Sequence, residues 1–225
     1  MSKRSGGVAI YGGTFDPFHN GHLRMAVETR EMLGLDTVFL VPSAHPPHKP
    51  LQPVTPASHR LAMVKAAVAE VAGLSVLDLE LRREGPSYSI LTVLEMKKNH
   101  PGADILFLIG ADAFSEITSW HRHEELLSAC DFLLLPRPGV LNEASFPSGV
   151  FLEPEENRCY SLGDMTEYRL RGGRKLLLLP LPTLDISSRS IREKVRRRRS
   201  IRGLVAPEVE RYIAEHALYR DEDGG

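Results

Sequence analysis

One stretch near the amino terminus, from Gly12 to His22, constrains the fold more than any other part of the sequence. It reads GGTFDPFHNGH, it follows the short apolar run 8–11, and it precedes a helix-like run that starts at Leu23. This order predicts a strand, a glycine-rich turn and a helix. Such a turn places backbone N–H groups and the positive end of a helix dipole at one point, where a phosphate group binds well.

Two histidines, His19 and His22, lie three residues apart in this turn. Histidine titrates near neutral pH, so either ring can donate a hydrogen bond to a phosphate oxygen or carry a charge against it. Taken alone, two glycines more often form a simple tight turn, and a single histidine is more often structural. Their combination at the carboxyl end of a first strand favours a ligand site, because open parallel sheets bind ligands there.

Six positions of this stretch match the pattern G-x-F-x-P-x-H-x-G-H: Gly13, Phe15, Pro17, His19, Gly21 and His22. Six fixed positions recur by chance on the order of once in a hundred thousand chains or less. The pattern is neither a P-loop nor the G-x-G-x-x-G of dinucleotide-binding folds. The chain resembles the adenylyl- and cytidylyltransferases, in which an H-x-G-H motif handles a nucleoside triphosphate. The substrate's own phosphate is then the nucleophile, so the protein supplies positioning and electrostatic stabilisation.

Composition excludes several other classes of protein. The chain has 225 residues, 42% of them hydrophobic, and a formal charge of -1, which suits one sizeable domain with no general attraction to nucleic acid or membrane. Only Cys130 and Cys159 are present, so neither a disulfide framework nor a four-ligand zinc site is expected, and Cys130 is predicted to be buried. No apolar stretch is long enough for a membrane span and no secretory signal precedes the first strand, so we expect a cytoplasmic protein.

Strand-like runs alternate with amphipathic helical runs along most of the chain, which is typical of a parallel sheet with helices on both faces. The expected fold class is α/β: a Rossmann-like doubly wound parallel sheet with a small C-terminal helical extension. Residues 1–185 are expected to form the nucleotidyltransferase domain, and residues 186–225 a helical segment that completes the ATP site. Strands are expected at 8–11, 37–41, 77–81, 105–109, 131–135 and 176–179.

Helix ends are predicted from their capping residues. Gly34 should end the first helix, Thr55 before Pro56 should cap the second, and Ser87 should cap the third. The hydroxyls of 186–190 should cap a further helix. The stretch 140–175 shows no regular pattern and is expected to be loops without chemistry, and the tail 221–225 is expected to be disordered.

Several polar residues follow predicted strands. The proline-rich loop 42–56 carries His45, His48 and Lys49; the histidines leave a metal site as a minor alternative, and Lys49 suits a substrate phosphate. Asp112 follows the strand 105–109, where it either meets a ribose hydroxyl or caps the next helix. Trp120 is either a core residue or, because it precedes a polar run, a platform for a flat heterocycle.

The run Arg196 to Arg199 follows a predicted helix start that is rich in serine and arginine. A helix start of this kind suits a second phosphate site. The arginine run itself is more consistent with a solvated helix face than with a nucleic-acid role, given the nearly neutral chain.

The resemblance extends from Tyr11 to Tyr219 and narrows to the bacterial nicotinate-nucleotide adenylyltransferases. It rests on the first motif together with these runs: Pro46-Pro47-His48-Lys49, 83–89, Gly110-Ala111-Asp112, Trp120-His121-Arg122, Arg137-Pro138-Gly139 and 186–192. It implies ATP and nicotinate mononucleotide as substrates, with Mg²⁺ carried by ATP and no resident metal, nucleic-acid or membrane partner. The oligomeric state stays open, a homo-oligomer included. The selectivity for nicotinate mononucleotide over nicotinamide mononucleotide also stays open.

The resemblance implies roles position by position. His19, His22 and Arg192 are the implied catalytic residues. The implied ATP contacts are Gly12, Gly13, Thr14, Phe15, His19, Gly21, His22, Gly110, Asp112, Ile186, Ser187, Ser188 and Arg192. The implied mononucleotide contacts are Lys49 for its phosphate, Trp120 for its ring, and the backbone at Tyr88 and Ser89 for its carboxylate. Arg189 stands where the family usually has threonine, so that position has no assigned role.

Three alternatives remain at this stage. A phosphopantetheine adenylyltransferase would share the chemistry, but it should be shorter and would have no reason for the segment around Trp120. A nucleotide-binding protein without activity would keep the fold. An RNA-binding protein would use the run Arg196 to Arg199 and would bind with a steep salt dependence.

Overall fold

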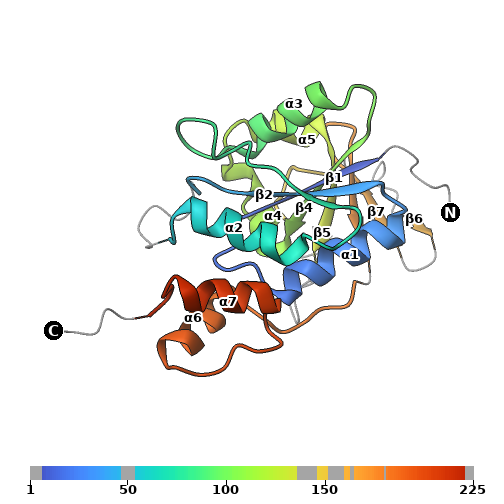
Figure 1. Cartoon of the computed structure of the whole chain (residues 1–225). Coiled ribbons are helices and arrows are strands. Elements are labelled where there is room, and N and C mark those ends of the chain that lie inside the picture. Colours follow the sequence, from blue (N-terminus) through green and yellow to red (C-terminus); the bar gives the residue numbers. More distant parts are fainter. Residues whose placement is uncertain are drawn as a thin grey trace.

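The computed structural model describes residues 7–46, 54–135, 146–151, 160–162, 165–179 and 181–220. Its strands form one eight-stranded sheet in the order β3-β2-β1-β4-β5-β8-β7-β6 (Figure 1). The strands are β1 Val8–Gly13, β2 Thr37–Pro42, β3 Leu74–Val76, β4 Ile105–Gly110, β5 Asp131–Leu135, β6 Tyr160–Leu162, β7 Met165–Arg169 and β8 Lys175–Leu178. The helices are α1 Asn20–Leu33, α2 Ala57–Val68, α3 Ser89–Asn99, α4 Ala111–Ser115, the 3-10 turn η1 Ile117–Ser119, α5 His123–Ala129, α6 Ser188–Arg196 and α7 Pro207–Glu215.

Six neighbouring strands of the sheet, β3, β2, β1, β4, β5 and β8, pair in parallel. The strand order reverses between β1 and β4. Open α/β sheets bind ligands outside the carboxyl ends of their strands at such a reversal. The Rossmann-like α/β prediction is confirmed, and the carboxyl ends of β1 and β4 mark where a site should lie.

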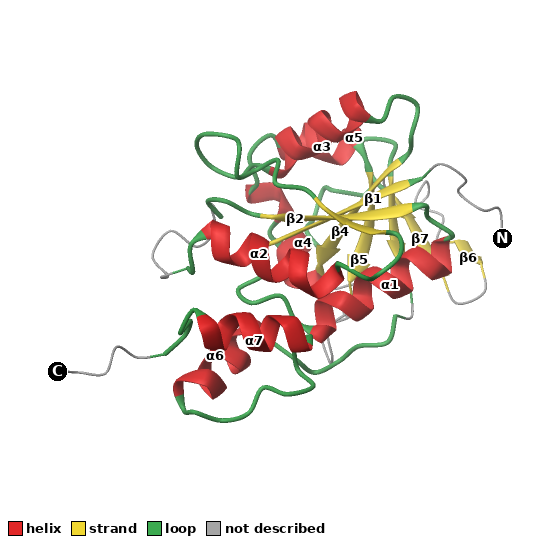
Figure 2. Cartoon of the chain, in the orientation of Figure 1, coloured by secondary structure: helices red, strands yellow, loops and turns green. Residues whose placement is uncertain are grey.

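Helices cover both faces of the sheet (Figure 2). Side chains of β1 alternate between two cores: Ala9 and Tyr11 face the core that α1, α2, α6 and α7 share, whereas Val8 and Ile10 face the core under α3 and α5. This two-sided burial explains why the central strands read as continuous apolar runs. The C-terminal helices α6 and α7 thus belong to one of the two layers and pack beside α1 and α2 (Figure 1).

The prediction of a strand at 77–81 is wrong. The strand β3 lies just before it, and the Leu77 N–H still donates to Leu40 O at 3.0 Å. The chain then turns, because the N–H groups of Leu81 and Arg82 both donate to Asp78 O. The alternation of leucine and acid therefore comes from a turn that packs leucines against the core and buries Glu80.

The stretch 140–175 is also not simply loops. Its described part contains β6 and β7, which extend the sheet in antiparallel fashion: β7 pairs with β8, and β6 pairs with β7. Phe146, Phe151 and Tyr168 form an aromatic cluster with Phe114 of α4. These aromatic residues are too widely spaced in the sequence to give a local period, so their packing depends on the tertiary fold.

Two of the predicted caps are confirmed and two are wrong. Gly34 ends α1 in the left-handed conformation with φ 61, and the Ser187 Oγ accepts from the Ser190 N–H at the start of α6. Thr55 does not cap α2, whose N-cap is Pro56, and Ser87 does not cap α3, whose N-cap is Tyr88. Ser87 instead accepts from the N–H groups of Ala44 and His45, so its hydroxyl joins two loops.

Cys130 is buried, as predicted, and burial raises the pKa of its thiol. No helix in the described part of the chain is long and apolar enough to cross a membrane. Residues 221–225, Cys159 and the run 137–139 lie outside the described residues.

Candidate nucleotide site

The motif stretch connects β1 to α1 at the point where strand order reverses. β1 ends at Gly13, and α1 begins at Asn20 with His19 as its N-cap. The helix therefore begins three residues before Leu23, and both motif histidines lie in its capping turn. This placement puts the motif at the ligand-binding edge of the sheet.

The two histidines cap the helix reciprocally. The His22 N–H donates to Nδ1 of His19, and the His19 N–H donates to Nδ1 of His22, each at 3.3 Å. Their rings stack with centroids 3.6 Å apart. Because each Nδ1 accepts a hydrogen bond, the proton of each neutral ring lies on Nε2, which makes that nitrogen a donor.

Aromatic side chains fix the orientation of the His22 ring. Phe18 stacks on it at 5.3 Å, and Tyr11 and Phe15 meet it edge-on. Phe18 is fully buried, and Phe15 is held in the left-handed region with φ 48. A ring packed on three sides has little rotamer freedom, so its donor is positioned before a ligand arrives.

Two motif glycines are needed because the backbone comes close to these rings. A Cβ on Gly13 would lie 2.7 Å from the Phe15 ring, and a Cβ on Gly21 would lie 3.0 Å from the His19 ring. Any larger residue would push the aromatic ring or the histidine aside. Packing therefore explains both fixed glycines of the pattern: Gly13 lies against Phe15, and Gly21 lies against His19.

Most N–H groups at the start of α1 already have acceptors. The Asn20 N–H donates to Leu204 O at 2.9 Å, and the His22 N–H donates to the His19 ring. Among the described residues, the Gly21 N–H has no acceptor. At the start of α1 itself, the expectation of several available N–H groups is thus reduced to the Gly21 N–H.

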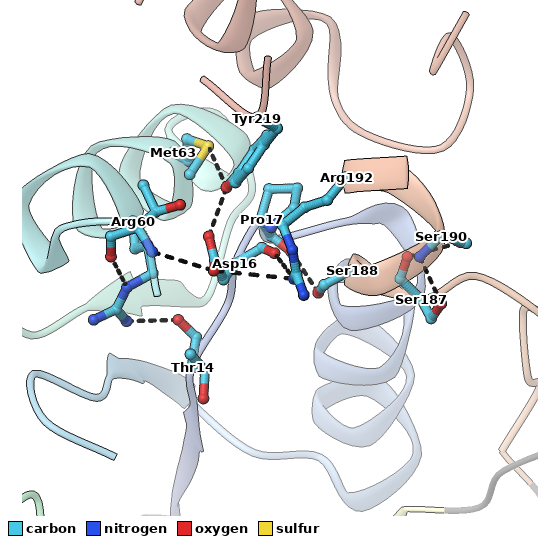
Figure 3. Close-up of polar contacts among 11 residues, drawn as sticks. Thr14, Asp16, Pro17, Arg60, Met63, Ser187, Ser188, Ser190, Arg192 and Tyr219 are labelled. Carbon is cyan, nitrogen blue, oxygen red and sulfur yellow. Dashed lines mark hydrogen bonds and ion pairs between the residues drawn. The ribbon is translucent and has the colours of Figure 1, made fainter. Parts of the chain in front are cut away.

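The start of α6 lies against the motif stretch (Figure 3). The Ser188 Oγ donates to Pro17 O at 2.9 Å, and the Arg192 Nη1 donates to Asp16 O at 2.6 Å. Ile186 lies beside Gly21. Ser187 and Arg189 are exposed at the same helix start. The second predicted phosphate site is therefore next to the first, although about 170 residues of sequence separate them.

The residues expected at the ribose lie at the end of β4, the strand beside β1. Gly110 is the N-cap of α4, and an added Cβ there would meet no atom within 4 Å. Asp112 is exposed in the first turn of α4 and does not cap it. The switch point therefore brings Gly110 and Asp112 to the same edge of the sheet as the motif.

The residues expected around the mononucleotide ring lie at the start of α3 and after η1. Tyr88 is the N-cap of α3, and its ring stacks on His121 with centroids 4.1 Å apart. Trp120 is half-buried and packs against the core under α3 and α5. The Tyr88–His121 stack brings Ser89 and Trp120 into one region of the surface. Lys49 and His48 lie outside the described residues.

Metal ligands do not gather anywhere in the described part of the chain, where no three His, Cys, Asp or Glu side chains could hold an ion. His45, the described histidine of the proline-rich loop, is exposed.

The arginine run begins at the end of α6. Arg196 and Arg197 both pair with Glu193 in the preceding turn, and the run is exposed. Cations near a helix carboxyl terminus are favoured by the helix dipole.

The sequence analysis missed three residues that hold the motif stretch in place. Arg60 is 1% exposed and donates to the carbonyl oxygens of Thr14, Ala44 and Thr55. Burial lowers the pKa of Arg60, an effect that nearby Asp16 opposes. Asp16 is buried, and it accepts from the hydroxyl of Tyr219 at 2.8 Å. Asp16 stands at a variable position of the motif, and neither Arg60 nor Tyr219 has a local sequence signal.

Sequence comparisons relate nearly the whole chain to known proteins. The model of the cytidylyltransferase-like family matches residues 10–194. A probable nicotinate-nucleotide adenylyltransferase of Geobacter metallireducens is 40% identical over 213 residues, which cover 94% of this chain and 97% of the relative. A probable nicotinate-nucleotide adenylyltransferase of Symbiobacterium thermophilum is 39% identical over 219 residues, which cover 97% of this chain and 98% of the relative.

Solved structures agree on the fold. The Plasmodium falciparum nicotinic acid mononucleotide adenylyltransferase complexed with NaAD has a TM-score of 0.70 at 20% identity, with 95% of this chain and 97% of that chain covered. The same enzyme complexed with APC gives a TM-score of 0.67 at 19% identity, with 95% and 96% covered.

Proposed function

The chain belongs to the cytidylyltransferase-like family, and we propose that it transfers AMP from ATP to nicotinate mononucleotide, releasing pyrophosphate and giving nicotinate adenine dinucleotide in NAD biosynthesis. The observation that carries the proposal is the stacked, reciprocally capped pair of His19 and His22 at the switch point, with the start of α6 docked against it. Full-length similarity to enzymes named nicotinate-nucleotide adenylyltransferases supports the choice of substrate.

The triphosphate binds between the starts of α1 and α6. From α1 it receives the Nε2–H groups of His19 and His22 and the Gly21 N–H, and from α6 it receives Ser187, Ser188 and Arg192. Gly12, Gly13, Thr14, Phe15 and Ile186 line the approach, and Gly110 with Asp112 meets the ribose at the end of β4. The segment 186–225 thus completes the ATP site.

The reaction is an in-line displacement at the α phosphorus of ATP. A phosphate oxygen of nicotinate mononucleotide attacks, a new phosphorus–oxygen bond forms, and the bond from the α phosphorus to the bridging oxygen breaks. Its electron pair leaves with pyrophosphate. The substrate is MgATP, so the magnesium ion arrives with the nucleotide. The two imidazole donors and Arg192 stabilise the charge that develops on the phosphates, where preorganised donors have their largest effect.

The mononucleotide binds between the start of α3 and the segment after η1. Trp120 stacks on the pyridine ring, and the backbone at Tyr88 and Ser89 meets the carboxylate at the start of an eleven-residue helix. The Ser89 N–H is the donor offered there, because the Tyr88 N–H already donates to Pro86 O at 3.0 Å. Lys49 faces the phosphate of the mononucleotide.

The test is pyrophosphate release from MgATP with nicotinate mononucleotide and nicotinamide mononucleotide in parallel. Release with the acid form alone supports both the reaction and the carboxylate pocket at Tyr88. Equal rates with both mononucleotides would support the reaction but contradict the proposed carboxylate pocket. Binding of MgATP without release from either mononucleotide contradicts the proposed transfer, and phosphopantetheine is then the next substrate to assay.

A further inference from the structure

The side chain of Asp16 lies at the centre of a polar network that joins three distant parts of the chain (Figure 3). Asp16 is 5% exposed. Its Oδ1 accepts from the Tyr219 hydroxyl at 2.8 Å, and its Oδ2 accepts from the Thr55 N–H at 3.3 Å. The motif stretch is therefore tied both to Thr55, two residues before α2, and to the segment after α7.

Arg192 is held by the same residue. Its Nη1 donates to Asp16 O at 2.6 Å and lies 3.9 Å from Asp16 Oδ2. The guanidinium thus contacts both the backbone carbonyl and the carboxylate of Asp16. An arginine side chain has many rotamers, and holding it in one orientation before a ligand binds lowers the entropic cost of binding.

Tyr219 is fixed as a donor to Asp16. Burial raises the pKa of its hydroxyl, and the nearby Asp16 carboxylate raises it further, so the hydroxyl keeps its proton. Tyr219 also has φ 62, a left-handed conformation that is unfavourable for tyrosine. Strained backbone persists only where the surrounding structure maintains it. Both observations indicate that the hydroxyl is held against the carboxylate by the fold around it.

We propose that Asp16 is a positioning residue for Arg192 and that Tyr219 sets the position of Asp16, so that the segment after α7 is coupled to phosphate binding. This inference rests on the proposed function, because it takes Arg192 as a ligand of the ATP phosphates. Asp16 and Tyr219 themselves need not touch the nucleotide. Their effect reaches it through the orientation of one guanidinium.

The chain offers a matched pair of tyrosines to test this. Tyr212 also lies in the C-terminal segment, and its hydroxyl contacts Nδ1 of His59 in α2 at 2.9 Å. Tyr219→Phe and Tyr212→Phe each remove one hydroxyl that ties this segment to the rest of the fold. Only the first removes a contact to the motif stretch. Tyr212→Phe therefore controls for loosened docking of α7.

The measurement is the dissociation constant of MgATP by calorimetry, together with the thermal unfolding midpoint, for both variants. Tyr219→Phe should weaken MgATP binding about fivefold to tenfold, which is less than the full effect of losing a hydrogen bond to a charged acceptor, because Tyr219 acts on the nucleotide only through Arg192. Tyr212→Phe should stay within about twofold of the wild type. Equal losses of affinity in both variants would mean that the hydroxyls act only through docking of the segment, and would overturn the proposal.

A double-mutant cycle with Arg192→Ala gives a readout that a purely structural role would not produce. If Tyr219 acts through Arg192, Tyr219→Phe should weaken MgATP binding in the wild-type background and have no further effect in Arg192→Ala. Additive losses would overturn the proposal. Asp16→Asn, which keeps the shape but removes the charge next to Arg192, should reproduce the loss seen with Tyr219→Phe, and wild-type affinity in Asp16→Asn would also overturn it.

These binding measurements separate the inference from the proposed reaction. If the wild type binds MgATP but releases no pyrophosphate with any mononucleotide, the proposed transfer fails while the cycle still decides the positioning role. If the wild type does not bind MgATP, both fail.

Discussion

The ring of His19 and the ring of His22 each accept a hydrogen bond from the other residue's backbone N–H, at 3.3 Å in both directions. A ring that took a proton at Nδ1 would lose its hydrogen bond and uncap α1. The two residues therefore cap the helix as a unit, and the same bonds place the proton of each neutral ring on Nε2.

His22→Ala should reduce kcat by about 10²-fold to 10³-fold, the usual cost of removing one preorganised donor from a charge that develops in the transition state. The fold should lose only about 1 kcal/mol of unfolding free energy with the cap contact. Pyrophosphate release and urea denaturation on the same sample separate the two effects. An active His22→Ala enzyme would remove the assigned role from this residue.

Trp120→Ala should raise KM for nicotinate mononucleotide about tenfold and leave KM for ATP nearly unchanged, because stacking on an aromatic ring contributes about 1 kcal/mol or more. Trp120 also packs against the core, so some stability should be lost as well. Trp120→Phe keeps a ring and should recover most of the affinity. Unchanged KM values in Trp120→Ala would return this residue to a purely structural role.

Much of the fold could be predicted because its information is local. The run 105–109 lies in the centre of the sheet and is apolar throughout, and Gly34 follows a helical period with a residue suited to a left-handed cap. The motif identified the edge of the sheet where the proposed site lies, because its pattern is fixed by contacts within eleven residues. Local patterns of this kind are read directly from the chain.

The missed features depend on contacts that the sequence does not encode locally. The alternation of 77–81 has a strand period but forms a turn, because Asp78 accepts from the backbone of residues 81 and 82. Ser87 carries a capping hydroxyl that serves another loop. Asp16, Arg60 and Tyr219 come from three separate segments, so their network exists only after the chain has folded.

Glu80 should make stability depend on pH. Burial raises the pKa of its carboxyl, while the hydrogen bond from Thr92 and the charge of Arg83 act in the opposite direction. Since the folded pKa exceeds the unfolded value of about 4.3, the folded state binds more protons, and this contribution is lost as pH rises through the folded pKa.

The Glu80→Gln variant lacks the titrating group, so the wild type should become progressively less stable relative to it as pH rises from the unfolded pKa of about 4.3 to the raised pKa of the folded state. Urea denaturation of both proteins across this range measures the difference in unfolding free energy. A difference that is constant with pH would show that Glu80 does not titrate in the folded protein over this range.

Arg60→Lys should destabilise the protein nearly as much as Arg60→Met, by about 3 kcal/mol, because an ammonium cannot reproduce three guanidinium contacts to separate carbonyl oxygens. Leaving those buried carbonyl groups without donors accounts for most of the loss. Denaturant unfolding of both variants provides the test. Wild-type stability in Arg60→Lys would mean that the charge matters and the fork geometry does not.

Substitutions at Gly12 and Gly13 can show whether the motif needs glycine for packing or for contact with the ligand. Both are proposed ATP contacts, so loss of activity alone cannot distinguish them, whereas stability can. A Cβ at Gly12 would lie 3.7 Å from the Phe107 ring, an ordinary contact, but a Cβ at Gly13 would lie 2.7 Å from the Phe15 ring. Gly13→Ala should therefore cost about 2 kcal/mol through overpacking.

Gly12→Ala should be close to neutral, because alanine restricts the unfolded chain more than glycine and fits the strand. The displaced Phe15 ring in Gly13→Ala also meets His22 edge-on, so kcat should fall with stability in that variant. Thermal unfolding of the two variants without nucleotide is the decisive comparison. Equal midpoints would mean that Phe15 can move aside without cost, and the requirement for glycine at position 13 would then have to be explained by the ligand.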